Sequence, residues 1–142
     1  MRKPAVVRLS FIPPMEPELV DQPPKDHGDW SHEAKFDGYR TQVIKDGDGI
    51  RFFTKNGFDW TAKYQPLAAE AAALEAESFI IEGETIVTND AGLSDFRALR
   101  SAITRRPQDL YLVGSRSFKM KGPGEGGSPG PWPCTRYKHV RL

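Results

Sequence analysis

Cysteine is nearly absent from the sequence: Cys134 stands alone among 142 residues, so no disulfide can form within the chain. With three scattered histidines, His27, His32 and His139, it gives none of the spacings typical of a metal site. A run of 18 apolar residues is also missing, which argues against a transmembrane helix. The basic start lacks the apolar segment of a signal peptide. We therefore expect a cytoplasmic protein with no membrane partner.

Net charge is small, at +1, but it is unevenly distributed along the chain. Residues 1–113 contain 14 Lys and Arg against 18 Asp and Glu, whereas residues 114–142 contain six against one. The larger part is therefore not a generic basic binder of nucleic acid, and any contact with DNA has to be local.

Proline and glycine divide the chain into three parts. Residues 1–30 hold six prolines and predict an extended lead, which either docks on a domain surface or stays free. Residues 31–113 carry the regular patterns of a folded domain. Residues 114–142 hold six Gly and four Pro without periodicity, and their few aliphatic side chains cannot offset the entropy of ordering. We expect this last part to be a disordered tail.

The middle part predicts an α+β fold in which an antiparallel sheet carries two helices. Asp46-Gly47-Asp48-Gly49 is a strong signal for a hairpin turn. Strand patterns occupy residues 32–36, 39–45, 50–54, 79–88 and 110–113.

Two segments predict the helices. Residues 63–77 are rich in Ala, Leu and Glu, and Pro66 suits the first turn of a helix there. Residues 95–103 predict a second helix that Ser94 would cap. Its apolar face would consist of Phe96, Leu99 and Ile103.

The segment from Glu33 to Arg40 contains the pattern K-x-D-G-x-R. A lysine such as Lys35 can attack phosphorus once it loses its proton, although an unperturbed lysine has a pKa of about 10.4. Asp37 can set a turn, Gly38 permits a close backbone approach or a positive φ, and Arg40 offers a fork for ribose or phosphate. The alternative is a hairpin whose charges are ordinary surface charges.

A second unusual pattern is Glu82-Gly83-Glu84, which follows the apolar residues 79–81. Strand alternation places Glu82 and Glu84 on one face. Two such acids are costly if buried without a partner, and Mg²⁺, a ribose or the Arg40 guanidinium would satisfy them. A solvated face is the alternative.

In their order along the chain, these segments resemble the adenylation domain of ATP-dependent DNA ligases, of the kind found in bacterial ligase D. The resemblance covers about residues 9–113 and implies part of a nucleotidyltransferase (ATP-grasp-like) fold. It is carried by residues 33–40 as the nucleotidyltransferase motif I, 54–61 as the Ser-Arg-Asn-Gly segment, 81–84 as the Asp-Gly-Glu motif III, the 95–99 run and the 13–15 lead.

The resemblance implies a division of labour. Lys35 would take AMP from ATP and release pyrophosphate. Arg40 and Glu84 would hold the ribose, with Glu84 also near a Mg²⁺ ion, and Glu33 would lie beside the adenine. Lys55 would approach the 5′ phosphate of nicked or broken double-stranded DNA. A Ku-type end-binding protein is the partner that the resemblance suggests.

Two departures from the family stand out. Lys55 replaces the usual arginine, so a point charge replaces a bidentate fork. After Val113 the family continues into an aromatic segment, a Glu-Gly segment, a Lys-rich strand and an OB-fold domain, none of which is evident here. We therefore expect an adenylation domain truncated after about residue 113. A frameshift or gene fusion near residue 114 would explain the change, and the other reading frames of the gene would test it.

Three functions stay open at this point. The first is ATP-dependent DNA ligation, or at least its lysine-adenylation half. The second is a catalytically inactive remnant that binds nucleotide weakly. The absence of the family's Lys-rich strand favours it, because those lysines would supply the charge that stabilises the transition state. The third is a related lysine nucleotidyltransferase, either an RNA ligase or a capping guanylyltransferase.

Overall fold

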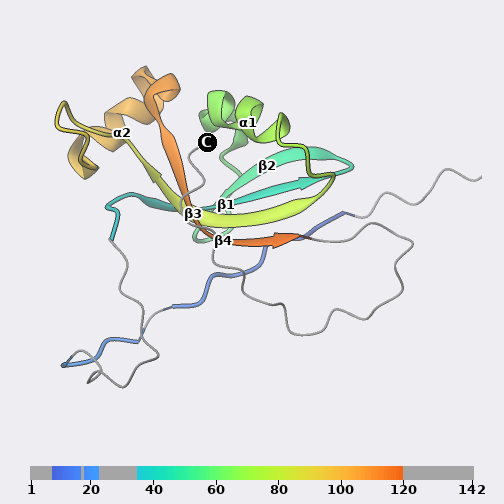
Figure 1. Cartoon of the computed structure of the whole chain (residues 1–142), viewed down its shortest axis with the longest axis horizontal. Helices are drawn as coiled ribbons and strands as arrows, with labels where there is room; N and C mark the ends of the chain where they lie inside the picture. Colours follow the sequence, from blue (N-terminus) through green and yellow to red (C-terminus); the bar gives the residue numbers. More distant parts are fainter. Residues whose placement is uncertain (1–7, 17, 23–34, 120–142) are drawn as a thin grey trace, which may run out of the picture.

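The computed structural model describes residues 8–16, 18–22 and 35–119 (Figure 1). These residues form one antiparallel sheet with the strand order β2-β1-β3-β4, joined by two α-helices and two short 3-10 helices. The strands are β1 (Tyr39–Asp46), β2 (Gly49–Thr54), β3 (Phe79–Ile86) and β4 (Tyr111–Lys119). The helices are η1 (Thr61–Tyr64), α1 (Gln65–Ala72), α2 (Phe96–Arg105) and η2 (Pro107–Asp109). The predicted α+β class is therefore confirmed.

The sheet lies between the helices on one face and the lead on the other (Figure 1). Side chains alternate along β1, so Val43 belongs to the core under the helices while Ile44 packs with Leu9 of the lead and with Ile80. No helix in the described ranges is long and apolar enough to cross a membrane. The main core is built from Val43, Phe52, Tyr64, Leu67, Ala71, Phe79, Ile81, Val87, Leu99, Ala102, Ile103, Leu110 and Leu112.

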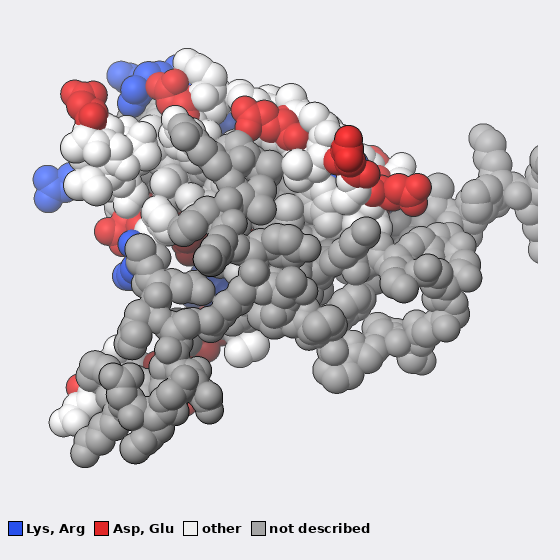
Figure 2. Space-filling view, in the orientation of Figure 1, with Lys and Arg blue, Asp and Glu red and all other residues white. Residues whose placement is uncertain are grey.

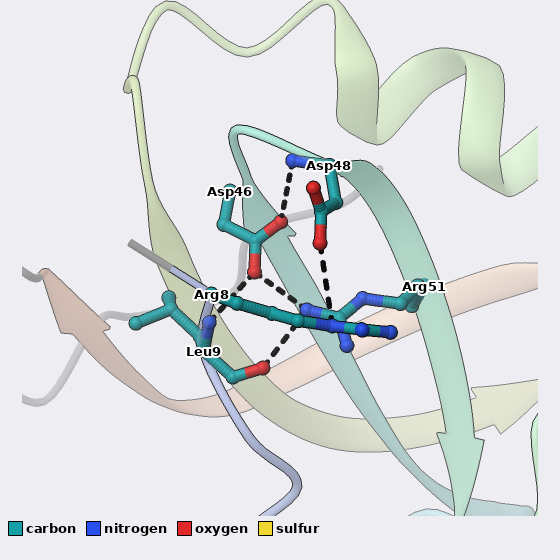
Figure 3. Close-up of polar contacts among 5 residues, drawn as sticks. All are labelled: Arg8, Leu9, Asp46, Asp48 and Arg51. Atoms are coloured by element: carbon teal, nitrogen blue, oxygen red, sulfur yellow. Dashed lines mark hydrogen bonds and ion pairs between the residues drawn. The ribbon is translucent and has the colours of Figure 1, made fainter. Parts of the chain in front are cut away.

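Polar contacts fix the start of the lead to the β1–β2 turn (Figure 3). The Leu9 amide donates to Asp46 Oδ2 at 2.7 Å. Arg51 Nη2 donates to the same oxygen at 2.5 Å and to the Leu9 carbonyl at 2.9 Å. Arg8 pairs with Asp48 at 3.3 Å on the surface. Of the two alternatives for the lead, docking is therefore the one that residues 8–16 adopt.

Replacing Asp46 by asparagine should weaken this anchor. The Asp46 side chain is almost fully buried, and the change removes the negative charge that Arg51 and the Leu9 amide both face. We expect a loss of about 2–3 kcal/mol in the free energy of unfolding, because hydrogen bonds to charged groups are the strong ones. Urea unfolding measures it, with the exposed Asp48→Asn as control. Equal losses in the two variants would contradict the assignment of the anchor to Asp46.

The middle of the lead is held by an amide and an aromatic ring. Gln42 accepts from the Ile12 amide at 2.9 Å and donates to the Ile12 carbonyl at 2.8 Å. The Phe11 ring lies 5.6 Å from the Phe53 ring and closely covers Gly57, whose φ of +81° favours glycine. The lead thus forms a thin second layer on this face of the sheet.

The first predicted helix is shorter than expected. In place of residues 63–77, η1 leads into α1, which has Pro66 in its first turn and ends at Ala72. At this end a long-range contact caps the helix: Lys45 Nζ donates to the carbonyls of Ala72 at 2.9 Å and Leu74 at 2.6 Å. A cation at the helix C-terminus satisfies carbonyl groups that would otherwise lack partners.

Two strand predictions need correction. Of residues 32–36, only Lys35 and Phe36 are described, and neither lies in a strand. The last strand does not stop at 113 but continues to Lys119 by pairing with β3. The disorder expected from residue 114 is therefore wrong for 114–119, because backbone pairing does not need aliphatic side chains; residues 120–142 lie outside the described part.

The cap of α2 also differs from expectation. Asp95, not Ser94, is the N-cap, and its Oδ1 accepts from the Ala98 amide at 3.0 Å. Ser94 instead accepts a bond of 3.3 Å from the amide of Asp37. Ser94 therefore connects the start of this helix to the segment that carries the K-x-D-G-x-R pattern.

Candidate active site

Gly38 fixes the position of the segment that precedes β1. A Cβ atom added at Gly38 would lie 2.2 Å from the carbonyl oxygen of Thr85 and 2.7 Å from Ile86 Cγ2. Glycine is therefore required here by the close approach of β3, one of the two explanations that the sequence left open. This contact holds Lys35 and Asp37 beside the end of β3.

The space between these segments is a pocket of about 350 Å³. Lys35 Nζ lies 4.0 Å from Asp37 Oδ1, and the Lys35 side chain is 91% exposed. The ammonium group is thus at the mouth of the pocket, in contact with solvent, rather than buried. The pocket is lined by Lys35, Phe36, Asp37, Gly38, Glu84 and Phe96.

Glu84 is the carboxylate that β3 contributes to the pocket. Burial raises the pKa of Glu84 above its ordinary value, and Asp37 adds to the rise. The cations of Arg40 and Lys35 act in the opposite direction but are outweighed. Glu84 is therefore a carboxylate kept in an unfavourable environment, which is typical of residues retained for a ligand.

This environment predicts how stability depends on pH. Because the folded-state pKa of Glu84 is raised, its ionisation destabilises the fold as pH rises through that pKa, and the penalty is absent below the ordinary value of 4.5. Glu84→Gln should therefore raise the melting temperature by a few degrees at pH 7, and the gain should vanish near pH 4. Calorimetry at both pH values measures it. The exposed Glu70→Gln is the control, and a gain independent of pH would contradict this account.

Glu82 and Glu84 lie on the same face of β3, as strand alternation predicts. Glu84 is opposite Arg40, and Glu82 is opposite Gln42, which contacts the lead on that face. Between the two acids the pairing of β3 with β4 shifts register at Gly83. The shared face is therefore the one that the lead crosses.

A second group of charged side chains meets the tip of the lead. Arg40 Nη1 donates to the Met15 carbonyl at 2.9 Å, and its Nη2 lies 3.8 Å from Glu82 Oε2. Lys55 Nζ pairs with Glu16 Oε1 at 2.9 Å. Arg40 and Lys55 therefore lie outside the pocket, at a crevice between the lead and the sheet that has no room for a water-sized molecule.

The structure thus brings together four of the predicted residues, namely Lys35, Asp37, Gly38 and Glu84. Glu33, predicted beside the adenine, lies outside the described residues.

The sequence did not indicate that Phe96 lines the pocket: its spacing suggested a core position, but it is 51% exposed. One signal for this exposed position was available: Phe96 is the first residue of α2, directly after the N-cap Asp95. Across the described ranges, no three His, Cys, Asp or Glu residues cluster as a metal site.

Comparisons with known proteins were made for the sequence and for the fold. Residues 19–120 match the family model described as ATP dependent DNA ligase domain. The multifunctional non-homologous end joining protein LigD of Pseudomonas aeruginosa is 40% identical over 106 residues, covering 72% of this chain and 12% of that protein. DNA ligase C of Mycobacterium tuberculosis is 33% identical over 111 residues, covering 78% of this chain and 31% of that protein.

Solved structures agree with the sequence matches. The ligase domain of LigD from M. tuberculosis superimposes with a TM-score of 0.54 at 27% identity, covering 60% of this chain and 28% of that one. A mycobacterial DNA ligase D complexed with ATP and MES gives a TM-score of 0.53 over the same shares. The chain spans less than a third of each of these relatives. Because the family model covers well over half of its residues, the chain belongs to the ATP-dependent DNA ligase family.

Proposed function

We propose that this chain carries the lysine-adenylation site of an ATP-dependent DNA ligase, with Lys35 as the nucleophile. The observation that carries the proposal is the meeting of Lys35 and Glu84 in one pocket of a ligase-family chain. The lone pair of Lys35 Nζ attacks the α-phosphorus of ATP, the bond from phosphorus to the bridging oxygen breaks, and pyrophosphate leaves. The ammonium first loses one proton to solvent, with which it is in contact, and this frees the lone pair; the nitrogen loses a second proton to solvent as the phosphoramidate forms.

The surrounding side chains have distinct tasks in this proposal. Phe36 and Phe96 supply apolar walls, and Glu84 accepts a hydrogen bond from a ribose hydroxyl. Arg40, which is opposite Glu84 across β1 and β3, supports the ribose beside that carboxylate. Asp37 holds the Lys35 ammonium near the pocket before it reacts. The neighbouring structure bound to ATP supports a nucleotide as the ligand.

A Mg²⁺ ion fits this site when it arrives with the nucleotide. Mg²⁺ binds through one or two carboxylates together with substrate phosphates, so it does not need a cage of protein ligands. Glu84 is the carboxylate that would hold it. The ion would neutralise phosphate charge and align the leaving group.

The later steps concern DNA. AMP would pass from Lys35 to a 5′ phosphate at a nick or break, which activates that end for sealing. Lys55 would approach this phosphate, and it already holds an anionic group, the Glu16 carboxylate, at 2.9 Å. Relatives named for non-homologous end joining support broken DNA as the substrate. The Ku-type partner stays a prediction.

The second candidate is a domain that binds nucleotide weakly without reacting. The 91% exposure of the Lys35 side chain favours it, because a solvated side chain is not held in one position for attack on a bound nucleotide. The two candidates share the same pocket and differ in covalent chemistry alone.

Labelling separates the candidates. The whole chain is incubated with α-labelled ATP and Mg²⁺, then tested for label that acid removes and base does not. Label that mass spectrometry locates on Lys35 supports the ligase proposal. Saturable binding of ATP without label supports the weak binder. Label from GTP but not from ATP would contradict the assignment of the nucleotide.

A further inference from the structure

The lead is held on the sheet in two different ways. Its first part is anchored where the almost fully buried side chains of Asp46 and Gln42 bond to its backbone. Residues 13–16, called the tip below, follow this anchor. In the described part of the chain, no backbone–backbone hydrogen bond joins the tip to the sheet. The Met15 side chain is exposed and adds little burial, so the tip is held mainly by polar contacts at its end.

Two cations of the sheet receive the tip. Glu16 Oε1 lies 2.9 Å from Lys55 Nζ, and the Met15 carbonyl accepts a hydrogen bond of 2.9 Å from Arg40 Nη1. The hydrogen bond and the charge of Lys55, with a smaller contribution from the charge of Arg40, hold the pKa of Glu16 below its ordinary value. Glu16 is therefore an anion at neutral pH. The tip thus offers acceptor oxygens to two cations, as a phosphate group would.

The tip also closes the space between these two cations. Arg40 and Lys55 line one crevice together with Pro14 of the tip, and this crevice has no room for a water-sized molecule. A phosphate group therefore cannot enter between them while the tip is in place. Other parts of the surface offer little to an anion, since Figure 2 shows mainly acidic side chains along the rim where Figure 1 places α1. An anion is attracted where cations gather, and the tip covers one such place.

We infer that the tip is an autoinhibitory contact, in which the Glu16 carboxylate occupies Lys55 and has to withdraw before Lys55 receives a terminal 5′ phosphate. The Glu16 and Lys55 side chains are 73% and 51% exposed, and exposed ion pairs are weak. A phosphate monoester carries about −1.5 to −2 charges at pH 7, more than a carboxylate, so it can displace Glu16. The anchor keeps the tip nearby for its return. The inference rests on the proposed function for the role of Lys55 and adds a regulation of that role.

Binding of a fluorescent nicked duplex, measured without ATP, tests this inference. Glu16→Gln keeps the shape of the side chain and removes the competing charge. We expect its affinity for the 5′-phosphorylated duplex to rise about threefold at low salt, the size of effect that an exposed ion pair allows. The matched control is Glu18→Gln, which removes the same charge from an exposed position two residues further on. This control should change the affinity by less than about 1.5-fold, because water and salt screen a charge that has no close partner.

Two further measurements tie the gain to Lys55 and to the terminal phosphate. In a Lys55→Gln background, Glu16→Gln should bring no gain, because a double-mutant cycle isolates the coupling between the two residues. On a duplex that ends in a 5′ hydroxyl, Glu16→Gln should bind no better than the control. A gain that appears there, or equally in the control, would overturn the inference in favour of general charge. Unchanged or weaker binding by Glu16→Gln would also overturn it, since Glu16 would then not block Lys55.

The outcome is separable from that of the proposed adenylation, because the binding measurement needs no ATP and no reaction of Lys35. A chain that takes label from ATP but gains no affinity through Glu16→Gln retains the lysine chemistry and overturns the autoinhibitory contact. A chain that gains affinity through Glu16→Gln but takes no label retains the autoinhibitory contact and contradicts adenylation.

Discussion

Lys35→Arg protein will acquire no covalent label from α-labelled ATP and Mg²⁺, although it keeps the charge and the approximate length of the side chain. A guanidinium group stays protonated and has no free lone pair for attack on phosphorus. Lys35→Ala should give the same result by removing the nitrogen. In both variants the label, measured by autoradiography of the denatured protein, should fall to background.

Stability is the companion measurement for this prediction. The Lys35 side chain is 91% exposed, so both variants should unfold within about 0.5 kcal/mol of the unchanged chain. The control is Lys63→Arg on η1, which lies over the Trp60 ring and should label normally. Label that persists in the two Lys35 variants would show that another group carries the nucleotide.

Gly83→Ala should have a large effect on stability, because the added methyl group meets the backbone of the neighbouring strand. The new Cβ would lie 2.1 Å from the carbonyl oxygen of Val113 and 2.9 Å from Gly114 Cα. Both are backbone atoms of β4, so relief requires the two strands to separate where their register already shifts. We expect a loss of at least about 4 kcal/mol, enough to unfold much of a marginally stable domain.

A second glycine provides the control. Gly92 has a φ of +76° but no atom within 4 Å of an added Cβ, so Gly92→Ala should lose about 1 kcal/mol through backbone strain alone. Circular dichroism during urea unfolding ranks the two variants. If Gly92→Ala proves the more damaging, the close approach of β3 and β4 is not what requires Gly83.

Local patterns predicted the parts of this fold that depend on nearby residues. The turn between Asp46 and Gly49 joins β1 to β2 as expected, and alternation placed Glu82 and Glu84 on one face. The order of the motifs was enough to indicate the ligase family, which the family model confirms. The turn and the alternation are signals contained within a short window of sequence, whereas the family was indicated by several such windows in a fixed order.

Long-range contacts account for what the sequence did not reveal. The end of α1 is capped by Lys45 of β1, and the lead is held on the sheet by Asp46 and Gln42. No periodicity reports such contacts, because the partners lie roughly 30 residues apart or more. β4 continues past Val113 for a similar reason, since the neighbouring backbone of β3 supports it whatever side chains it carries.

Long-range contacts also account for what the sequence did not reveal about the candidate site. The structure places Lys35 and Glu84, which come from two separate motifs, in one pocket. The sequence offered the Arg40 guanidinium as a partner for the paired acids, and Arg40 does lie 3.8 Å from Glu82, but nothing in the sequence indicated its contact with the Met15 carbonyl. Phe96 was assigned to the core because spacing along a helix cannot tell a buried first turn from an exposed one. Whether the first turn of a helix is buried depends on its position in the fold, which only the structure gives.

The thin layer formed by residues 8–16 also has a consequence for synthesis on the ribosome. This segment is translated before β1 and β3, whose surfaces it covers. Because synthesis adds about 5–20 residues per second, several seconds pass before both strands have been made. When β3 brings Ile80 beside Ile44, an apolar surface appears on the nascent chain, and Leu9 is already at hand to cover it. The order of translation thereby shortens the time during which this surface is open to other nascent chains and to chaperones.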